Sequence, residues 1–297
     1  MKFKDSFHPY AMVTILFWSL AYVFTRLTLQ YFSAFSLGFL RYFIASCALL
    51  FVVVCLKLQP PRKKEIPWFF AAGGVGFFLY MIAFNQGQAV VTAATGSIVI
   101  ATVPVITALL ARFAYQEHLS GFQWVAIFLE FAGVAVLTLM HSTFSLNHGV
   151  LWLLLAALFL SLYNLLQRRL TKTYTALQTS AYSIFSGTLL LAIFAPAAIQ
   201  ELPHAPPVQF LYLAVLGIGS SAIAYVSWAK AFSKAAQTSQ VSNYMFVTPF
   251  LTSILGFLIA QETPDVSTLI GGIIIMFGVL LFHLGGKSTA KNRTSRN

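Results

Sequence analysis

Ten apolar stretches, each about as long as a membrane-spanning helix, run through the chain and are separated by short polar breaks. Apolar residues make up 59% of the 297 residues and charged residues only 8%, which excludes an ordinary soluble domain. The sequence therefore predicts an all-α integral membrane protein with ten transmembrane helices. Their approximate ranges are 9–30, 33–56, 66–87, 89–113, 119–139, 149–170, 175–199, 207–231, 236–260 and 266–285.

Positive charge is distributed unevenly over the predicted loops. Of the 18 Lys and Arg residues, all except Arg26 and Arg41 lie in the two tails or in the even-numbered loops. Because loops rich in Lys and Arg stay on the cytoplasmic side, both termini are predicted to be cytoplasmic, which requires an even number of spans. We attribute the net charge of +11 to this topology and not to nucleic-acid binding.

The two halves of the chain, 1–142 and 143–297, resemble each other at an offset of 145 residues. The matched pairs include Tyr80 and Tyr225, Ser97 and Ser242, Pro104 and Pro249, and Gly133 and Gly278. A unit of five spans is odd in number, so its second copy must cross the membrane in the opposite direction. Inverted repeats of this kind are typical of transporters, in which the substrate binds near the membrane midplane between the halves.

These two tandem five-helix units, with "FLRYF" in the second span and "FLIAQETPDVSTLIGGIIIMFGVLL" near the end, resemble the EamA family of the drug/metabolite transporter superfamily. The resemblance covers essentially the whole chain. It implies a ten-helix fold with a central cavity lined mainly by spans 1, 3, 4, 6, 8 and 9, while spans 5 and 10 act as scaffold. It also implies a bacterial inner membrane and small organic substrates, often amino acids or other metabolites that leave the cell.

Candidate substrate-binding residues are the aromatic and small polar side chains of these spans, because ring faces with a few donors and acceptors are typical of small-molecule pockets. The alternatives are that small residues allow close helix packing and that aromatic residues anchor the span ends. The candidates are Trp18, Tyr22, Tyr80, Asn85, Ser97, Pro104, Tyr163, Asn164, Tyr225, Trp228, Ser242, Asn243 and Pro249.

Two of these candidates, Pro104 and Pro249, lie inside predicted spans 4 and 9 at matching positions. Each proline removes a backbone donor and obstructs the carbonyl group four residues earlier. Carbonyl groups freed inside a membrane need protein or water as partners. The prolines therefore predict either the border of a cavity or a bend between packed helices.

Two charged residues, Arg41 and Glu130, lie well inside predicted spans. The repeat position of Glu130 is Ile275, so the fold does not require an acid there. At about 1.5 Å per helical residue, the two charges reach a similar depth, which favours a structural Arg41–Glu130 ion pair between scaffold helices. A protonated Glu130 hydrogen-bonded to a neighbour and a proton-coupling role are the alternatives.

Other charged residues are expected to lie outside the cavity. With no Lys or Arg expected deep in it, a multiply charged phosphate compound would lack a counter-charge, and a neutral or zwitterionic substrate fits better. Arg26 is expected to reach toward the membrane surface, with a gate as the alternative. Glu117 and Glu262 are expected to cap the helices that begin near Ser120 and Asp265.

The leading functional hypothesis is a secondary-active or facilitative transporter of a small metabolite that works by alternating access. The alternative is a channel or lipid-handling scaffold without alternating access. The sequence shows no metal-ligand spacing, catalytic motif or phosphate-binding glycine loop, so no metal, cofactor, catalytic residue or nucleic-acid partner is predicted. Uniport or exchange is the expected mode, and the oligomeric state stays open between monomer and homodimer.

Overall fold

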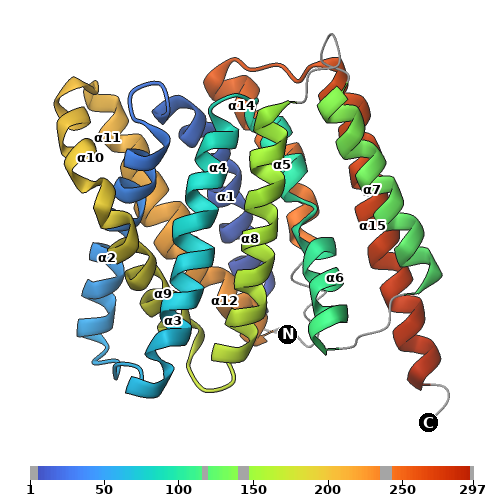
Figure 1. Cartoon of the computed structure of the whole chain (residues 1–297), viewed down its shortest axis with the longest axis horizontal. Helices are drawn as coiled ribbons and strands as arrows, with labels where there is room; N and C mark the ends of the chain where they lie inside the picture. Colours follow the sequence, from blue (N-terminus) through green and yellow to red (C-terminus); the bar gives the residue numbers. More distant parts are fainter. Residues whose placement is uncertain (1–5, 116–119, 140–146, 235–242, 295–297) are drawn as a thin grey trace.

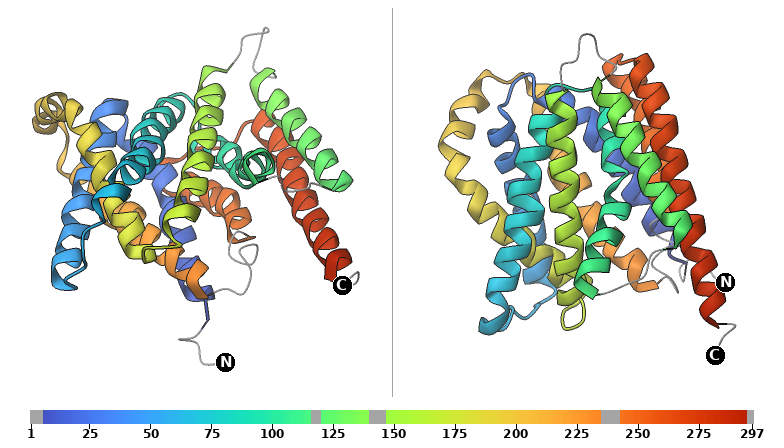
Figure 2. Two further views of the ribbon diagram at one scale, coloured as in Figure 1. Left: turned by 60° about the horizontal axis from the view of Figure 1, so that its bottom comes forward. Right: turned by 45° about the vertical axis from the view of Figure 1, so that its right-hand side comes forward.

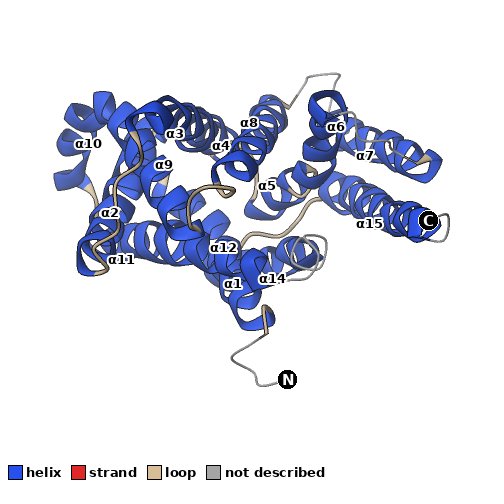
Figure 3. Ribbon diagram, turned by 90° about the horizontal axis from the view of Figure 1, so that it is seen from below, coloured by secondary structure: helices blue, strands red, loops and turns tan. Residues whose placement is uncertain are grey.

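The computed structural model of the protein describes residues 6–115, 120–139, 147–234 and 243–294. Within these ranges every regular element is a helix and no strand occurs (Figure 3). The predicted all-α class is therefore confirmed. Ser242 and Glu117 lie outside the described residues, and so do the side chains of Pro104 and Asn243.

Helix starts in the first half are marked by hydroxyl side chains. Ser33 caps α2 by accepting a hydrogen bond from the Ser36 amide, and Thr92 caps α5 by accepting one from the Thr95 amide. The elements of this half are α1 (His8–Thr28), α2 (Ala34–Cys55), η2 (Lys63–Glu65), α3 (Ile66–Gly73), η3 (Gly74–Leu79), α4 (Tyr80–Gln88), α5 (Ala93–Ile100), α6 (Val103–Tyr115) and α7 (Gly121–Leu139).

Polar side chains also cap the first helices of the second half. The Asn147 side chain caps α8, and Thr175 forms a capping box with Gln178 at the start of α9. The elements of the second half are α8 (His148–Leu170), α9 (Ala176–Leu191), η4 (Ala192–Phe194), α10 (Ala195–Glu201), η5 (Leu202–His204), α11 (Pro207–Ala214), η6 (Val215–Ile223), α12 (Ala224–Lys234), η7 (Asn243–Val247), α14 (Thr248–Ala260) and α15 (Val266–Thr294).

The outer surface of the bundle is apolar. Phe51, Phe128 and Ile273 are each at least 70% exposed, and a surface of this kind is stable only in contact with lipid or another apolar partner. Within the described residues, six helical stretches are long and apolar enough to cross a membrane: His8–Thr28, Ala34–Cys55, Lys63–Gln88, His148–Gln167, Ala176–His204 and Pro207–Ala231. Four shorter apolar helices accompany them: Ala93–Thr107, Gly121–Val136, Thr248–Ala260 and Val266–Phe282.

The two halves start at opposite ends of the bundle. The end of α1 lies beside the end of α4, where Arg26 Nη1 donates to the Gln88 carbonyl over 3.3 Å. The start of α8 lies at this end too, because a Cβ atom on Gly87 would lie 2.9 Å from the Gly149 carbonyl oxygen. We call it the upper end, as drawn in Figure 1, where α1 begins and α15 ends at the opposite, lower end.

Two π-helical segments occupy matching positions in the two halves. They are η3, which leads directly into Tyr80, and η6, which is followed by Ala224 and Tyr225. A π-helix adds a residue to the turn and therefore rotates the residues after it, and such segments are frequent at functional sites. The two halves therefore share a π-helical segment as well as sequence similarity.

The two matched prolines each lie in the first turn of a helix that follows a break. Pro104 is the second residue of α6, after a turn at Ala101–Thr102, and Pro249 is the second residue of α14, after the 3₁₀ segment η7. Proline is tolerated in a first turn because the missing N–H would have no intrahelical partner there. The sequence therefore predicted the places where the chain leaves the helix.

Helices α7 and α15 pack along each other and form one edge of the bundle (Figures 1 and 2). Their contact is reciprocal. A Cβ atom on Gly133 would lie 2.6 Å from Ile275 Cγ1, and a Cβ atom on Gly278 would lie 2.8 Å from Glu130 Cγ. Because 130 matches 275 and 133 matches 278 in the repeat, the same contact is made twice.

Candidate functional site

A small central cavity lies between the two halves. The first half contributes residues of α1, α2, α4 and α5, and the second half contributes residues of α8, α12, η7 and α14. The free volume is about 40 Å³, which is room for a few water molecules. The described residues that line the cavity are Trp18, Ala21, Tyr22, Arg41, Tyr80, Phe84, Ser97, Ile100, Ala101, Leu160, Tyr225, Met245 and Thr248.

Aromatic rings form much of the cavity wall. The Trp18 ring lies 5.6 Å from that of Tyr225 and 5.0 Å from that of Trp228, measured between centroids. On the other side, Tyr22 packs edge to face on Phe84 at 5.4 Å. Such rings contact apolar groups and attract cations over their faces.

Residues at the two helix breaks also line the cavity. Ile100 ends α5 and Ala101 follows it, while Met245 lies in η7 and Thr248 is the first residue of α14. Non-helical backbone at membrane depth is tolerated where it is buried in protein or lines a cavity, and broken helices hold the substrate in many transporters. The placement matches what the prolines indicated in the sequence.

Arg41 is part of the cavity wall, contrary to the expectation that no Lys or Arg lies there. Its side chain is only 5% exposed, and its Nε donates to Ser221 Oγ over 2.7 Å. The guanidinium carbon lies 5.7 Å from the centroid of the Tyr42 ring. The cavity therefore carries a fixed positive charge, and the argument for a neutral or zwitterionic substrate loses its basis.

The predicted Arg41–Glu130 ion pair is wrong. Arg41 lies on α2, which is on the opposite side of the bundle from α7, the helix that carries Glu130 (Figure 1). Glu130 is buried where α7 packs on α15, with its side chain against Gly278. The rise per residue determines the depth of a residue in the bundle but not its lateral position, and the prediction used depth alone.

Five predicted residues line the cavity, and a sixth lies next to it. The five are Trp18, Tyr22, Tyr80, Ser97 and Tyr225, and the sixth, Trp228, packs on Trp18. They come from α1, α4, α5 and α12, so both halves contribute. The sequence did not identify Arg41 and Thr248 as cavity residues.

Four other candidates have different surroundings. Asn85 Nδ2 donates to the Ala34 carbonyl over 2.8 Å, and Asn164 Nδ2 donates to Thr107 Oγ1 over 3.4 Å, so both amides join helices. Tyr163 packs edge to face on Phe77 behind the cavity. Pro249 lines a separate apolar groove of about 710 Å³ between α5, α14 and α15.

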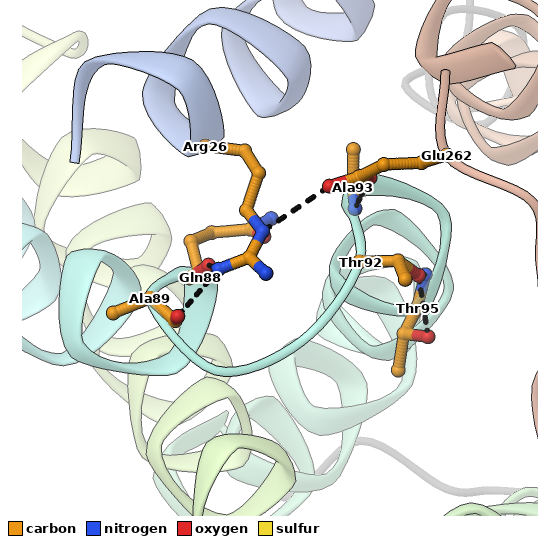
Figure 4. Close-up of polar contacts among 7 residues, drawn as sticks. All are labelled: Arg26, Gln88, Ala89, Thr92, Ala93, Thr95 and Glu262. Atoms are coloured by element: carbon orange, nitrogen blue, oxygen red, sulfur yellow. Dashed lines mark hydrogen bonds and ion pairs between the residues drawn. The ribbon is translucent and has the colours of Figure 1, made fainter. Parts of the chain in front are cut away.

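A cluster of polar contacts lies at the upper end of the bundle, and Figure 4 shows it in close-up. Arg26 Nε pairs with Glu262 Oε1 at 3.1 Å, and Arg26 Nη1 donates to the carbonyl groups of Gln88 and Ala89. Glu262 Oε2 accepts from the Ala93 amide over 2.8 Å. The cluster joins α1, α4, α5 and the link between α14 and α15.

The structure corrects the expectations for Glu262 and Arg26, two residues of this cluster. Glu262 caps α5 and not α15, whose first turn is capped instead by Asp265, which accepts from the Thr268 amide over 2.7 Å. The Arg26 side chain is 32% exposed but is held by the ion pair, so it does not simply extend toward the membrane surface.

An all-helical bundle with an apolar exterior and a cavity between two sequence repeats defines a multi-pass integral membrane protein of the repeat-built transporter class. The sequence profile of the EamA-like transporter family matches residues 7–139 and 147–284. The chain therefore belongs to the EamA-like transporter family, within the drug/metabolite transporter superfamily.

Several relatives from other organisms align over most of the chain. An uncharacterised transporter, YdfC, of Bacillus subtilis is 30% identical, with 90% of this chain and 87% of the relative covered. A probable terminal-alkyne amino-acid exporter of Streptantibioticus cattleyicolor is 27% identical, with 92% and 91% covered. An S-adenosylmethionine uptake transporter of Rickettsia prowazekii is 26% identical, with 88% and 86% covered. These bacterial relatives agree with the predicted bacterial inner membrane.

The fold also occurs in a solved structure, described as the crystal structure of a protein. It has a TM-score of 0.62 and 19% sequence identity, and the match covers 92% of this chain and 94% of the solved one. At this identity the similarity concerns the fold alone.

Proposed function

We propose that this protein carries a small organic metabolite through the central cavity by alternating access. In this proposal the chain crosses the membrane ten times as two inverted five-helix repeats, with both termini cytoplasmic, and it acts as a transporter without catalysing a reaction. The observation that carries the proposal is the cavity between the halves, with Tyr80 and Tyr225 at matching positions after η3 and η6. Repeat-related walls allow two conformations of similar construction, each open on one side.

The substrate class in this proposal is an amino acid or a related compound, and the direction is export. The relative described as an amino-acid exporter aligns over nearly the whole chain and supports this class. The relative described as an S-adenosylmethionine uptake transporter shows that substrate and direction differ among similar chains. The residues that line the cavity of this chain must therefore determine its substrate and its direction of transport.

Two features of this conformation must change during transport in this proposal: the small volume of the cavity and the polar cluster at the upper end. Substrate enters only after the rings around the cavity move apart, since the free volume is about 40 Å³. The Arg26–Glu262 ion pair links α1 of the first half to the α14–α15 link of the second half. Opening the upper end in this scheme requires that pair to break.

Flux into proteoliposomes tests the proposal. Purified full-length protein should exchange a radiolabelled amino acid against the same unlabelled compound trapped inside, in a panel that includes S-adenosylmethionine. Counterflow requires a carrier that returns loaded, whereas a channel or a lipid-handling scaffold produces none. Absence of counterflow for every compound would contradict the proposed function.

Uniport or exchange is the proposed mode of transport, because no Asp or Glu occurs among the cavity-lining residues that the structure describes. A proton-coupled carrier needs a group that titrates in the pathway, and Glu130 lies instead between α7 and α15. We expect Glu130→Gln to retain transport, with the same response to an imposed pH gradient as the wild type. Loss of a pH response in this variant alone would assign proton coupling to Glu130.

A further inference from the structure

Arg41 is a buried cation without a carboxylate partner in the described part of the chain. Its hydrogen bond is made to a neutral hydroxyl group, that of Ser221. No Asp or Glu is among the described residues that line the same cavity. Buried charges in proteins are normally paired, because an uncompensated charge in a medium of low polarity is costly. The missing counter-charge is the observation to be explained.

The guanidinium is held in position by the packing of α2 against η6. Ser221 lies on η6 and fixes Nε, and Gly217 on the same segment lets the backbone of α2 approach. A Cβ atom on Gly217 would lie 2.6 Å from Ile44 and 3.0 Å from the Arg41 carbonyl oxygen. A guanidinium group has five N–H donors, so the bond through Nε leaves the four on the Nη atoms.

The surroundings of Arg41 in the cavity are aromatic. Trp18, Tyr22 and Tyr80 border the same space, and Tyr225 packs on Trp18. A planar guanidinium binds a carboxylate through two parallel hydrogen bonds, which a single lysine cannot reproduce. Ring faces beside it suit an apolar or aromatic body. One positive charge balances one carboxylate and leaves a phosphate ester with two charges undercompensated.

We infer that Arg41 binds the carboxylate of the transported molecule, and that the substrate is a monocarboxylate with an apolar or aromatic body. The inference rests on the proposed transport function and adds the chemical group that the cavity selects. A molecule with a net positive charge is disfavoured, because Arg41 repels it and the described part of the cavity wall contains no acid. The substrate of this chain therefore differs in charge from a sulfonium compound such as S-adenosylmethionine.

Paired acids and amides test this inference directly. The purified full-length protein is titrated with the apolar and aromatic amino acids, with 3-phenylpropionate, and with the carboxamide of each. Binding is followed by the fluorescence of the tryptophan residues, since Trp18 lies in the wall and Trp228 packs on it. The wild type should bind at least one acid about tenfold to a hundredfold more tightly than its amide.

Variants at Arg41 should remove that preference. Arg41→Gln should weaken binding of the acid by a similar factor and leave binding of the amide within about twofold. Arg41→Lys should keep part of the preference, because the charge remains while the planar pair of donors is lost. Arg169→Gln removes a positive charge that stacks on Trp68 outside the cavity, and it should bind the acid as the wild type does.

Ser221→Ala provides a second route if the Arg41 variants do not fold. It keeps the charge but frees Nε, so we expect binding of the acid to weaken severalfold. Equal binding of acid and amide by the wild type, or full binding of the acid by Arg41→Gln, would overturn the inference. Counterflow of amides or amines without dependence on Arg41 would overturn the inference alone, whereas no counterflow for any compound would remove the proposed function as well.

Discussion

Arg26 and Glu262 form an ion pair of 3.1 Å between α1 and the link that joins α14 to α15. The two residues are 236 positions apart, in different halves of the chain. Each also holds the backbone of a third segment, since Arg26 bonds to carbonyl groups at the end of α4 and Glu262 bonds to the Ala93 amide. The pair therefore connects the two halves at the upper end of the bundle.

Removing this ion pair should favour opening of the upper end. In a chain with Cys47 and Cys55 replaced, Ser97→Cys places a single thiol in the cavity wall. Adding Arg26→Gln should increase its rate of labelling by a membrane-impermeant maleimide, applied from the upper side, about threefold to tenfold. This range follows from the loss of a partly exposed ion pair together with charged hydrogen bonds.

The matched control for this experiment is Glu201→Gln. Glu201 accepts a hydrogen bond from the Ser33 amide and has no ion pair in the described part of the chain. Its replacement should leave the labelling rate within about twofold. Equal labelling with and without Arg26→Gln would show that the ion pair does not restrain the upper end.

The Trp18 ring should contribute directly to substrate binding. Trp18→Ala removes the ring that contacts both Tyr225 and Trp228, so the KM for counterflow should rise about threefold to tenfold, in line with the loss of aromatic contacts. Trp18→Phe should retain most of the affinity. Trp152, which is 40% exposed on α8, supplies the comparison, and an equal effect of Trp152→Ala would point to general destabilisation.

Because the contact between α7 and α15 is reciprocal, replacing Gly133 or Gly278 by a larger residue should lower the stability of the protein by a similar amount. Gly133→Val and Gly278→Val each put atoms where Ile275 or Glu130 already lies, and overpacking of this kind costs about 1–3 kcal/mol. Both should lower the Tm in detergent by roughly 3 °C or more. Gly121→Ala, which has no neighbouring atom within 4 Å, should leave the Tm nearly unchanged. An unchanged Tm in both valine variants would contradict the close approach.

Composition and periodicity determined much of the fold. Membrane-spanning helices are identified by their apolar length, and their order in the chain needs no knowledge of neighbours. The repeat then identified Tyr80 and Tyr225 as a pair, and both lie in the cavity wall. Proline likewise indicated the helix breaks, because its effect on a helix is local.

Composition and repeat spacing do not show which helices pack side by side. Arg41 faces the cavity because α2 packs on η6, a contact between residues 180 positions apart. The π-helical turns rotate the residues that follow them, and no spacing rule for α-helices accounts for that rotation. Asn85 and Tyr163 are of residue types that often line pockets. In the structure Asn85 instead donates to the Ala34 carbonyl group and Tyr163 packs on Phe77, so both hold helices together.

The exchanged contacts of α7 and α15 have the form of an isologous interface between identical subunits. In such an interface residue i of one copy touches residue j of the other, and j touches i in return. Glu130 on Gly278 and Ile275 on Gly133 obey that rule within one chain. The two halves therefore meet along α7 and α15 as two copies of one subunit would, and Glu130 opposite Ile275 is the point where this contact departs from two-fold symmetry.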